Sequence, residues 1–179
     1  MLEISKRLFN KARRRYVIQM GPIRSGSTLV FNTLKKCYPN FYIYKTHKIP
    51  KLKSRFIVLT YRHPYDCIAS SMMRCKEKIN NDNIRTHIEE YLDNGGRVIE
   101  EMMQIPNSLI LKYENIYNDH EYLIESIEKY IGISIEKDKK MIKNHISISN
   151  SMKIASKYRS FNELDKESQI HGRHISKWK

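Results

Sequence analysis

The chain has 179 residues, with 33 Lys and Arg against 19 Asp and Glu, and its formal net charge is +14. This length predicts one domain over residues 1–179, and the 40% of hydrophobic residues, with 10% aromatic, excludes a chain too polar to form a core. So positive a charge predicts an anionic partner, which is a nucleic acid, a membrane surface or a phosphorylated small molecule.

Two further features bear on where the protein works. The sequence has no run of about 18 apolar residues, so no transmembrane helix is predicted, and the basic segment 1–15 lacks the apolar core of a secretory signal. The cysteines, Cys37, Cys67 and Cys75, are odd in number and have no paired metal-ligand spacing. We therefore expect reduced thiols in a cytoplasmic protein.

Taken in chain order, the predicted strands alternate with helices. Strands are predicted over residues 16–20, 41–44, 55–61 and 108–113. Helices are predicted over residues 1–14, 28–36, 64–78, 84–104 with a break at Gly95-Gly96, and 119–130 with Gly132 ending it; residues 80–83 are predicted to be a polar break, and the chain from about residue 136 to be helical or irregular. The alternation predicts an α/β fold with three αβα layers and a central parallel sheet. Ligands of such sheets bind beyond the carboxyl ends of the strands.

The first loop, residues 21–28, follows a strand and opens a helix. Its outline is that of the P-loop, G-x-x-x-x-G-K-[ST], with Ser27 in place of the Lys. Consecutive N–H groups at the start of a helix still face an anion in such a loop. The third strand ends in Tyr61-Arg62 and not in the acid that holds magnesium in phosphoryl transferases. We therefore expect a site for phosphate-like oxygens without a metal; the alternative is a Gly/Ser turn with a solvated Arg24.

The segment Pro22-Ile23-Arg24-Ser25-Gly26-Ser27-Thr28 resembles the phosphosulfate-binding loop of the sulfotransferases that use 3′-phosphoadenosine 5′-phosphosulfate (PAPS). The resemblance implies a P-loop sulfotransferase-like fold, and it implies that Arg24 contacts the oxygen that bridges phosphorus and sulfur. It also implies that the backbone amides of residues 25–28, which are Ser25, Gly26, Ser27 and Thr28, hold the 5′-phosphate. The hydroxyls of Ser27 and Thr28 would add hydrogen bonds to it.

A second loop, Arg62 to Ser70, follows the third strand. An arginine fork and a hydroxyl beside the start of a helix suit a phosphate dianion. The segment resembles the 3′-phosphate motif of the same family, R-x-P-x-x-x-x-x-S, which implies that Arg62 and Ser70 bind the 3′-phosphate of PAPS and of its product, 3′,5′-ADP. Taken alone, Arg62 is as consistent with a role in a structural ion pair as with a role in ligand binding.

The second strand is followed by Lys45-Thr46-His47, which resembles the K-T-H segment of the soluble sulfotransferases. The resemblance implies that Lys45 and Arg24 stabilise charge on the transferring group and that His47 accepts the acceptor's proton. Fixed cations and a base with a pKa near neutrality suit this chemistry. The alternatives are a loop histidine that only forms hydrogen bonds, and a carboxylate base as in some relatives.

Two weaker resemblances lie further along the chain. The segment 111–115 is similar to a strand end at which Tyr113 borders the adenosine pocket, although Tyr113 is equally consistent with packing under the sheet. The segment 172–178 is similar to a stretch whose basic residue, here Arg173, supplements the 3′-phosphate site. His171 and His174 lack acidic or thiol neighbours at ligand spacing, so no metal is predicted.

Together these resemblances imply a sulfotransferase that moves a sulfuryl group from PAPS to a hydroxyl, or less commonly an amine, of a small-molecule or carbohydrate-type acceptor. The acceptor site is expected in residues 84–104 and 144–169, because no cofactor motif lies there. No nucleic-acid partner is expected. The alternatives are a P-loop nucleotide or small-molecule kinase, a basic nucleic-acid-binding module, and a family member that binds the cofactor without transfer.

Overall fold

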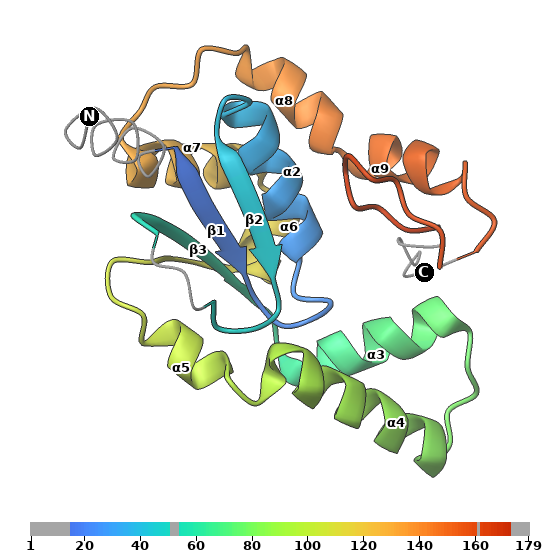
Figure 1. Ribbon diagram of the computed structural model, residues 1–179. Helices are drawn as coiled ribbons and strands as arrows, with labels where there is room; N and C mark the ends of the chain where they lie inside the picture. The colour runs from blue at the N-terminus through green and yellow to red at the C-terminus, as the bar shows by residue number, and fades with distance from the viewer. Residues whose placement is uncertain (1–14, 51–53, 161, 173–179) are drawn as a thin grey trace, which may run out of the picture.

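The computed structural model describes residues 15–50, 54–160 and 162–172 (Figure 1). The predicted helix over residues 1–14 lies outside the described residues, and so does the predicted site residue Arg173.

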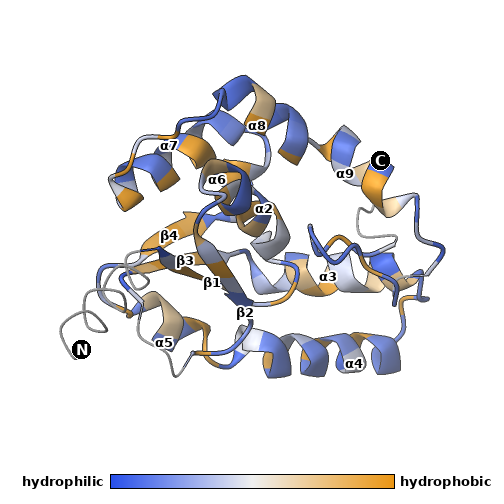
Figure 2. Ribbon diagram, turned by 45° about the horizontal axis from the view of Figure 1, so that its top comes forward, coloured by the Kyte–Doolittle hydropathy of each residue, from blue (hydrophilic) through white to orange (hydrophobic). Residues whose placement is uncertain are grey.

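Four parallel strands form the central sheet: β1 (Tyr16–Met20), β2 (Tyr42–Thr46), β3 (Phe56–Tyr61) and β4 (Leu109–Lys112). Their order is β2-β1-β3-β4, and the register pairs Tyr16 with Tyr42 and Val17 with Phe56. Every described pair in the sheet is parallel, which confirms the predicted α/β class. Figure 2 shows hydrophobic residues along β3 and β4, as strands covered on both faces require.

Helices cover both faces of the sheet, as a three-layer αβα arrangement requires (Figure 1). The first face carries α2 (Ser27–Cys37), α6 (Tyr113–Tyr117), α7 (His120–Ile131) and α8 (Lys139–Ile146), which α9 (Ile148–Ala155) continues. The second carries α3 (Pro64–Cys75), α4 (Asn81–Tyr91), the π-helical turn η1 (Leu92–Gly96) and α5 (Ile99–Met103). Each described helix is too short or too polar to traverse a lipid bilayer.

Each face of the sheet has its own apolar core. On the first face, Val17 and Val58 of the strands pack with Leu34 of α2 and Leu123 of α7, all fully buried. On the second face, a smaller cluster joins the strands to α5: Ile18, Met20, Leu59 and Met102. Neighbouring residues of one strand point to opposite faces, which is why Val17 and Ile18 lie in different cores.

Several element boundaries differ from the prediction, and capping explains the start of α4. The polar break predicted at residues 80–83 is wrong, because α4 already begins at Asn81. The side chain of Asn80 accepts a hydrogen bond from Asn83 N at 2.8 Å and caps the helix. The strand predicted to end at Tyr113 ends at Lys112, since α6 starts directly after it. Gly132 does end α7, in the left-handed conformation with φ 69°.

The strand order places two connections side by side at the carboxyl edge of the sheet. β1 and β3 are neighbours, and the chain leaves them toward α2 and α3, which lie on opposite sides of the sheet (Figure 1). Such a divergence opens a crevice between two parallel strands, and it is where open α/β sheets bind ligands. The loops after β1 and β3 therefore meet at one place, although more than thirty residues separate them along the chain.

Candidate functional site

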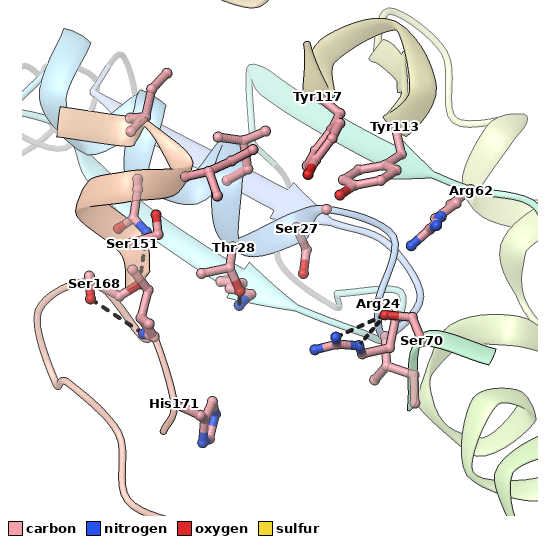
Figure 3. A pocket seen from close by; sticks show the side chains of 18 of the residues that line it. Arg24, Ser27, Thr28, Arg62, Ser70, Tyr113, Tyr117, Ser151, Ser168 and His171 are labelled. Carbon is pink, nitrogen blue, oxygen red and sulfur yellow. Dashed lines mark hydrogen bonds between the residues drawn. The ribbon is translucent and has the colours of Figure 1, made fainter. Parts of the chain in front are cut away.

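A cavity of about 660 Å³ lies at the carboxyl edge of the sheet (Figure 3). Of the predicted site residues that the structure describes, all but Ser25 line it: Arg24, Gly26, Ser27, Thr28, Lys45, His47, Arg62, Ser70 and Tyr113. They come from the carboxyl ends of all four strands and from the helices that follow, so the parallel topology brings these distant segments together.

The first wall of the cavity is the start of α2. Gly26 precedes the helix with φ 89°, and no side chain caps the first turn. The leading N–H groups of a helix lack intrahelical partners and carry partial positive charge. Gly26, Ser27 and Thr28 line the cavity, and Figure 3 shows the Ser27 side chain directed into it. A Cβ atom at Gly26 would lie 2.5 Å from the Tyr113 ring, so no larger residue fits here.

A buried hydrogen-bond network supports this loop from below. Thr60 Oγ1 lies 3.2 Å from Ser25 Oγ and accepts from Gln19 Nε2, also at 3.2 Å. Ser25 Oγ in turn donates to Pro22 O at 2.6 Å. Ser25 was predicted to bind the cofactor, but its hydroxyl and its amide both bond back to Pro22, so it shapes the loop. The sequence did not predict this role for Gln19 and Thr60, because both residues lie among apolar residues of their strands.

The side chain of Arg24 joins the first loop to α3. Arg24 donates to Ser70 Oγ from Nε at 3.1 Å and from Nη2 at 2.8 Å (Figure 3). Burial, and then the nearby Arg74 guanidinium, lowers the pKa of Arg24 to about 10, so the side chain remains charged at neutral pH. Arg74 lies one helical turn beyond Ser70 and also lines the cavity, although sequence reasoning did not find it. Two cations this close favour an anion between them.

Lys45, at the end of β2, reaches the same wall from the other side. Its Nζ donates to Thr28 Oγ1 at 2.8 Å. Burial lowers the pKa of Lys45 to about 8, so the ammonium group is still mainly charged at neutral pH. An anion bound at the start of α2 would restore some of the stabilisation that the ammonium loses with its water.

His47 lies beside the first loop, where a backbone carbonyl fixes the tautomer of its ring. Nδ1 of His47 is 2.7 Å from Gly21 O. Because a carbonyl oxygen only accepts, Nδ1 carries the proton and Nε2 keeps the lone pair of the neutral ring. Burial lowers the pKa of His47, which favours this neutral form. Since His47 also lines the cavity, its chemistry is that of a base at the cavity wall.

Arg62 is held over an aromatic face at the mouth of the second loop. Its guanidinium carbon lies 4.5 Å from the centre of the Tyr113 ring, and the side chain is only 12% exposed. Its Nε faces the Glu114 carboxylate at 3.9 Å, beyond hydrogen-bond distance, and has no hydrogen-bond partner among the described residues. The guanidinium is therefore held in place while its Nε–H remains available to a ligand, as a phosphate-binding arginine requires.

The opposite wall is less charged and comes from the C-terminal third of the chain. Figure 3 shows Ser151, Ser168 and His171 there, and the apolar side chain of Ile154 also lines the cavity. This agrees with the expectation that residues 144–169 border the site.

The segment 84–104, expected beside them, lines none of the described cavity. It supports the first loop instead, since Asn94 O accepts from Ile23 N at 3.0 Å and Gly95 packs against Pro22. A Cβ at Gly95, which has φ 106°, would lie 2.9 Å from the Pro22 Cα, so the glycine allows this close approach.

No protein-family model matches the sequence, and no curated protein is significantly similar to it. What the cavity can do must therefore be inferred from its residues. It offers uncapped helix N–H groups, hydroxyls and four cationic side chains, with the Asp66 and Glu114 carboxylates at its border. This composition suits a ligand with several phosphate-like groups.

Proposed function

We propose that this protein is a PAPS-dependent sulfotransferase with a P-loop, sulfotransferase-like fold, and that it transfers a sulfuryl group to a hydroxyl of a small acceptor. One observation carries the proposal. The loop after β1 and the loop after β3 meet on a single cavity, where Arg24 of the first loop donates to Ser70 of α3. Two anion-binding turns on one cavity fit a nucleotide that carries phosphate at both its 3′ and its 5′ positions.

The residues divide between the two ends of such a nucleotide. The N–H groups at the start of α2, with the Ser27 and Thr28 hydroxyls, would hold the 5′-phosphosulfate. Arg62 and Ser70 would hold the 3′-phosphate, with Arg62 kept in place by its stacking on Tyr113. Tyr113 would then border the adenosine, and Arg173 remains a proposed supplement to the 3′-phosphate site.

Transfer needs a bond from sulfur to the acceptor oxygen to form while the bond to the bridging oxygen breaks, and PAPS supplies the sulfuryl group. His47 Nε2 accepts the proton of the acceptor hydroxyl, because Nδ1 is committed to Gly21 O. Lys45 and Arg24 stabilise negative charge on the bridging and leaving oxygens. In the ligand-free protein Arg24 donates to Ser70 Oγ. When the cofactor binds, Arg24 would give up these hydrogen bonds and donate to the bridging oxygen instead.

Two features favour this reaction over phosphoryl transfer. Ser27 occupies the position of the P-loop lysine, and β3 ends at Tyr61 followed by Arg62, so the magnesium-binding acid is missing at that point. The cations that remain act without a metal. We further propose a cytoplasmic protein that acts on a small-molecule or carbohydrate-type hydroxyl rather than on nucleic acid. Four cationic side chains, those of Arg24, Lys45, Arg62 and Arg74, line one cavity, and this supports a compact anionic ligand.

Calorimetric titration of the full chain tests the proposal. We expect 3′,5′-ADP to bind at least tenfold more tightly than AMP and ATP, with no gain from added magnesium. One charge-assisted contact to the 3′-phosphate, worth about 1.5–3 kcal/mol, accounts for such a preference. Magnesium-dependent binding of ATP that exceeds binding of 3′,5′-ADP would contradict the proposal and favour a kinase. Tight DNA binding with a steep salt dependence would favour the nucleic-acid alternative.

A further inference from the structure

A second group of reactive side chains lies outside the cavity, where the end of α3 meets α4. Cys75, Glu77 and His87 each direct one potential metal ligand toward the others, and these three atoms all lie within 4.8 Å of one another. None of the three residues lines the cavity. Figure 1 shows α3 and α4 running side by side, and the cluster connects them.

The turn at the end of α3 brings two of these side chains together. Lys76 adopts the left-handed conformation with φ 57°, and Glu77 N donates back to Met72 O at 3.3 Å. This reversal closes the helix in the manner of a Schellman motif. It places Cys75, in the last helical position, and Glu77, just after the turn, beside the same residue of α4.

His87 is the centre of the cluster and is only 3% exposed. Its Nδ1 lies 3.0 Å from Glu90 Oε2, and its Nε2 lies 3.1 Å from Glu77 Oε2. A neutral imidazole has one N–H and therefore cannot donate to both carboxylates. If Nδ1 donates to Glu90, Nε2 presents its lone pair toward a carboxylate oxygen, an arrangement that a shared cation between the two atoms would stabilise.

We propose that Cys75 Sγ, Glu77 Oε2 and His87 Nε2 bind a zinc ion, with water as the fourth ligand. Thiolate, imidazole and carboxylate are the ligands that zinc prefers, with bonds of about 2.0–2.3 Å. Ligand atoms around a tetrahedral ion of that size lie roughly 3.3–3.8 Å apart. The 3.1 Å between Glu77 Oε2 and His87 Nε2 is close to this range. A pair at the 4.8 Å limit must approach by about 1–1.5 Å to close around the metal.

The other ring nitrogen of His87 has the kind of partner that zinc-binding histidines have. A ligating histidine usually donates its other N–H to a carboxylate, which orients the ring. Glu90 occupies that position here, and Ser71 Oγ of α3 donates to the same Glu90 oxygen at 3.1 Å. Zinc would therefore connect α3 and α4 behind the candidate functional site, since Ser70 lies on α3 and α4 leads to the turn that supports the first loop.

The probe is cobalt(II), which replaces zinc and reports a thiolate ligand by a charge-transfer band in the near ultraviolet. We expect the full chain, after treatment with chelator, to bind one equivalent of cobalt with this band, and zinc to displace it. Cys75→Ser should abolish the band, and Glu77→Gln should weaken binding at least tenfold. The control is Glu89→Gln, because Glu89 is an exposed residue of α4, the helix that carries His87. This variant should leave the band and the affinity for cobalt unchanged.

The site would be disproved if the wild-type chain binds no cobalt, or if the band persists in Cys75→Ser. The first result would identify the cluster as a hydrogen-bonded contact between α3 and α4 without a metal. The second would place the metal on another thiol, Cys37 or Cys67. Circular dichroism of each variant shows whether it is folded. Because the Glu77 side chain is 38% exposed and its change to Gln preserves shape, that variant keeps the test decisive if Cys75→Ser does not fold.

Discussion

The cavity and the α3–α4 cluster are both rich in ionisable groups, but they balance charge in opposite ways. In the cavity, Arg24 and Lys45 donate to hydroxyls, and Arg62 stacks on a ring. In the cluster, both nitrogens of His87 face carboxylates.

This difference separates binding from stability. Cations bonded to neutral hydroxyls keep much of their electrostatic attraction for an incoming anion. An imidazole that faces two carboxylates contributes to the fold instead. We therefore expect changes in the cavity to reduce ligand binding or turnover and to leave the free energy of unfolding nearly unaltered. Changes in the cluster should do the reverse.

The largest effect is expected for His47→Ala. Loss of the base should lower sulfuryl transfer from PAPS about 10²–10⁴-fold, while the affinity for 3′,5′-ADP stays the same. The measurement is transfer to 4-nitrophenol together with release of sulfate to water. His47→Asn is the matched control, because its amide can still donate to Gly21 O without acting as a base. Full activity in either variant would show that another group, such as a carboxylate, removes the proton.

A smaller effect is expected for Arg62→Ala. The variant should lose about 10–100-fold in affinity for 3′,5′-ADP, because a charge-assisted hydrogen bond is worth about 1.5–3 kcal/mol. Its affinity for AMP, which has no 3′-phosphate, should change far less. Calorimetry with both nucleotides measures the difference. Equal losses for the two would mean that Arg62 acts through its ion pair with Glu114 and not on the ligand.

In the cluster, His87→Gln should cost stability and not binding. Leaving the two carboxylates without their buried partner should lower the free energy of unfolding by about 1–3 kcal/mol in the presence of chelator. Urea denaturation measures this, and Glu89→Gln serves as the exposed control on α4. Unchanged stability, or a large loss of 3′,5′-ADP binding, would break the proposed separation of the two regions.

The smallest effect concerns pH. Burial lowers the pKa of Lys45 to about 8 in the free protein, and a bound phosphate would raise it again. Binding of 3′,5′-ADP then takes up a proton above pH 8, so affinity should be constant below pH 8 and fall by up to about tenfold per pH unit above it. Calorimetry across pH 7 to about pH 9 measures this slope. Lys45→Arg, which stays charged, should abolish it.

Local patterns were sufficient for the order of the elements and for the glycine-bearing loop before α2. The apolar strands, Gly132 at the end of α7 and the glycine-bearing turn before α2 follow from residue preferences over a few positions. The start of α4 was misplaced because Asn80, Asn81 and Asn83 suggest a loop by composition, and only the capping geometry shows where the helix begins. The buried Gln19–Thr60 network was missed for a related reason, since its two halves lie on different strands.

The sequence by itself determined the class of fold and the chemical type of the cavity, because strand–helix alternation and a glycine-bearing turn before a helix are encoded over short distances. Only the tertiary structure decided that Arg24 meets Ser70, that residues 84–104 support the first loop and do not line the cavity, and that Cys75, Glu77 and His87 converge. These facts depend on strand order and on how α3 and α4 pack. Such contacts join residues that are distant in the chain, so no local pattern carries them.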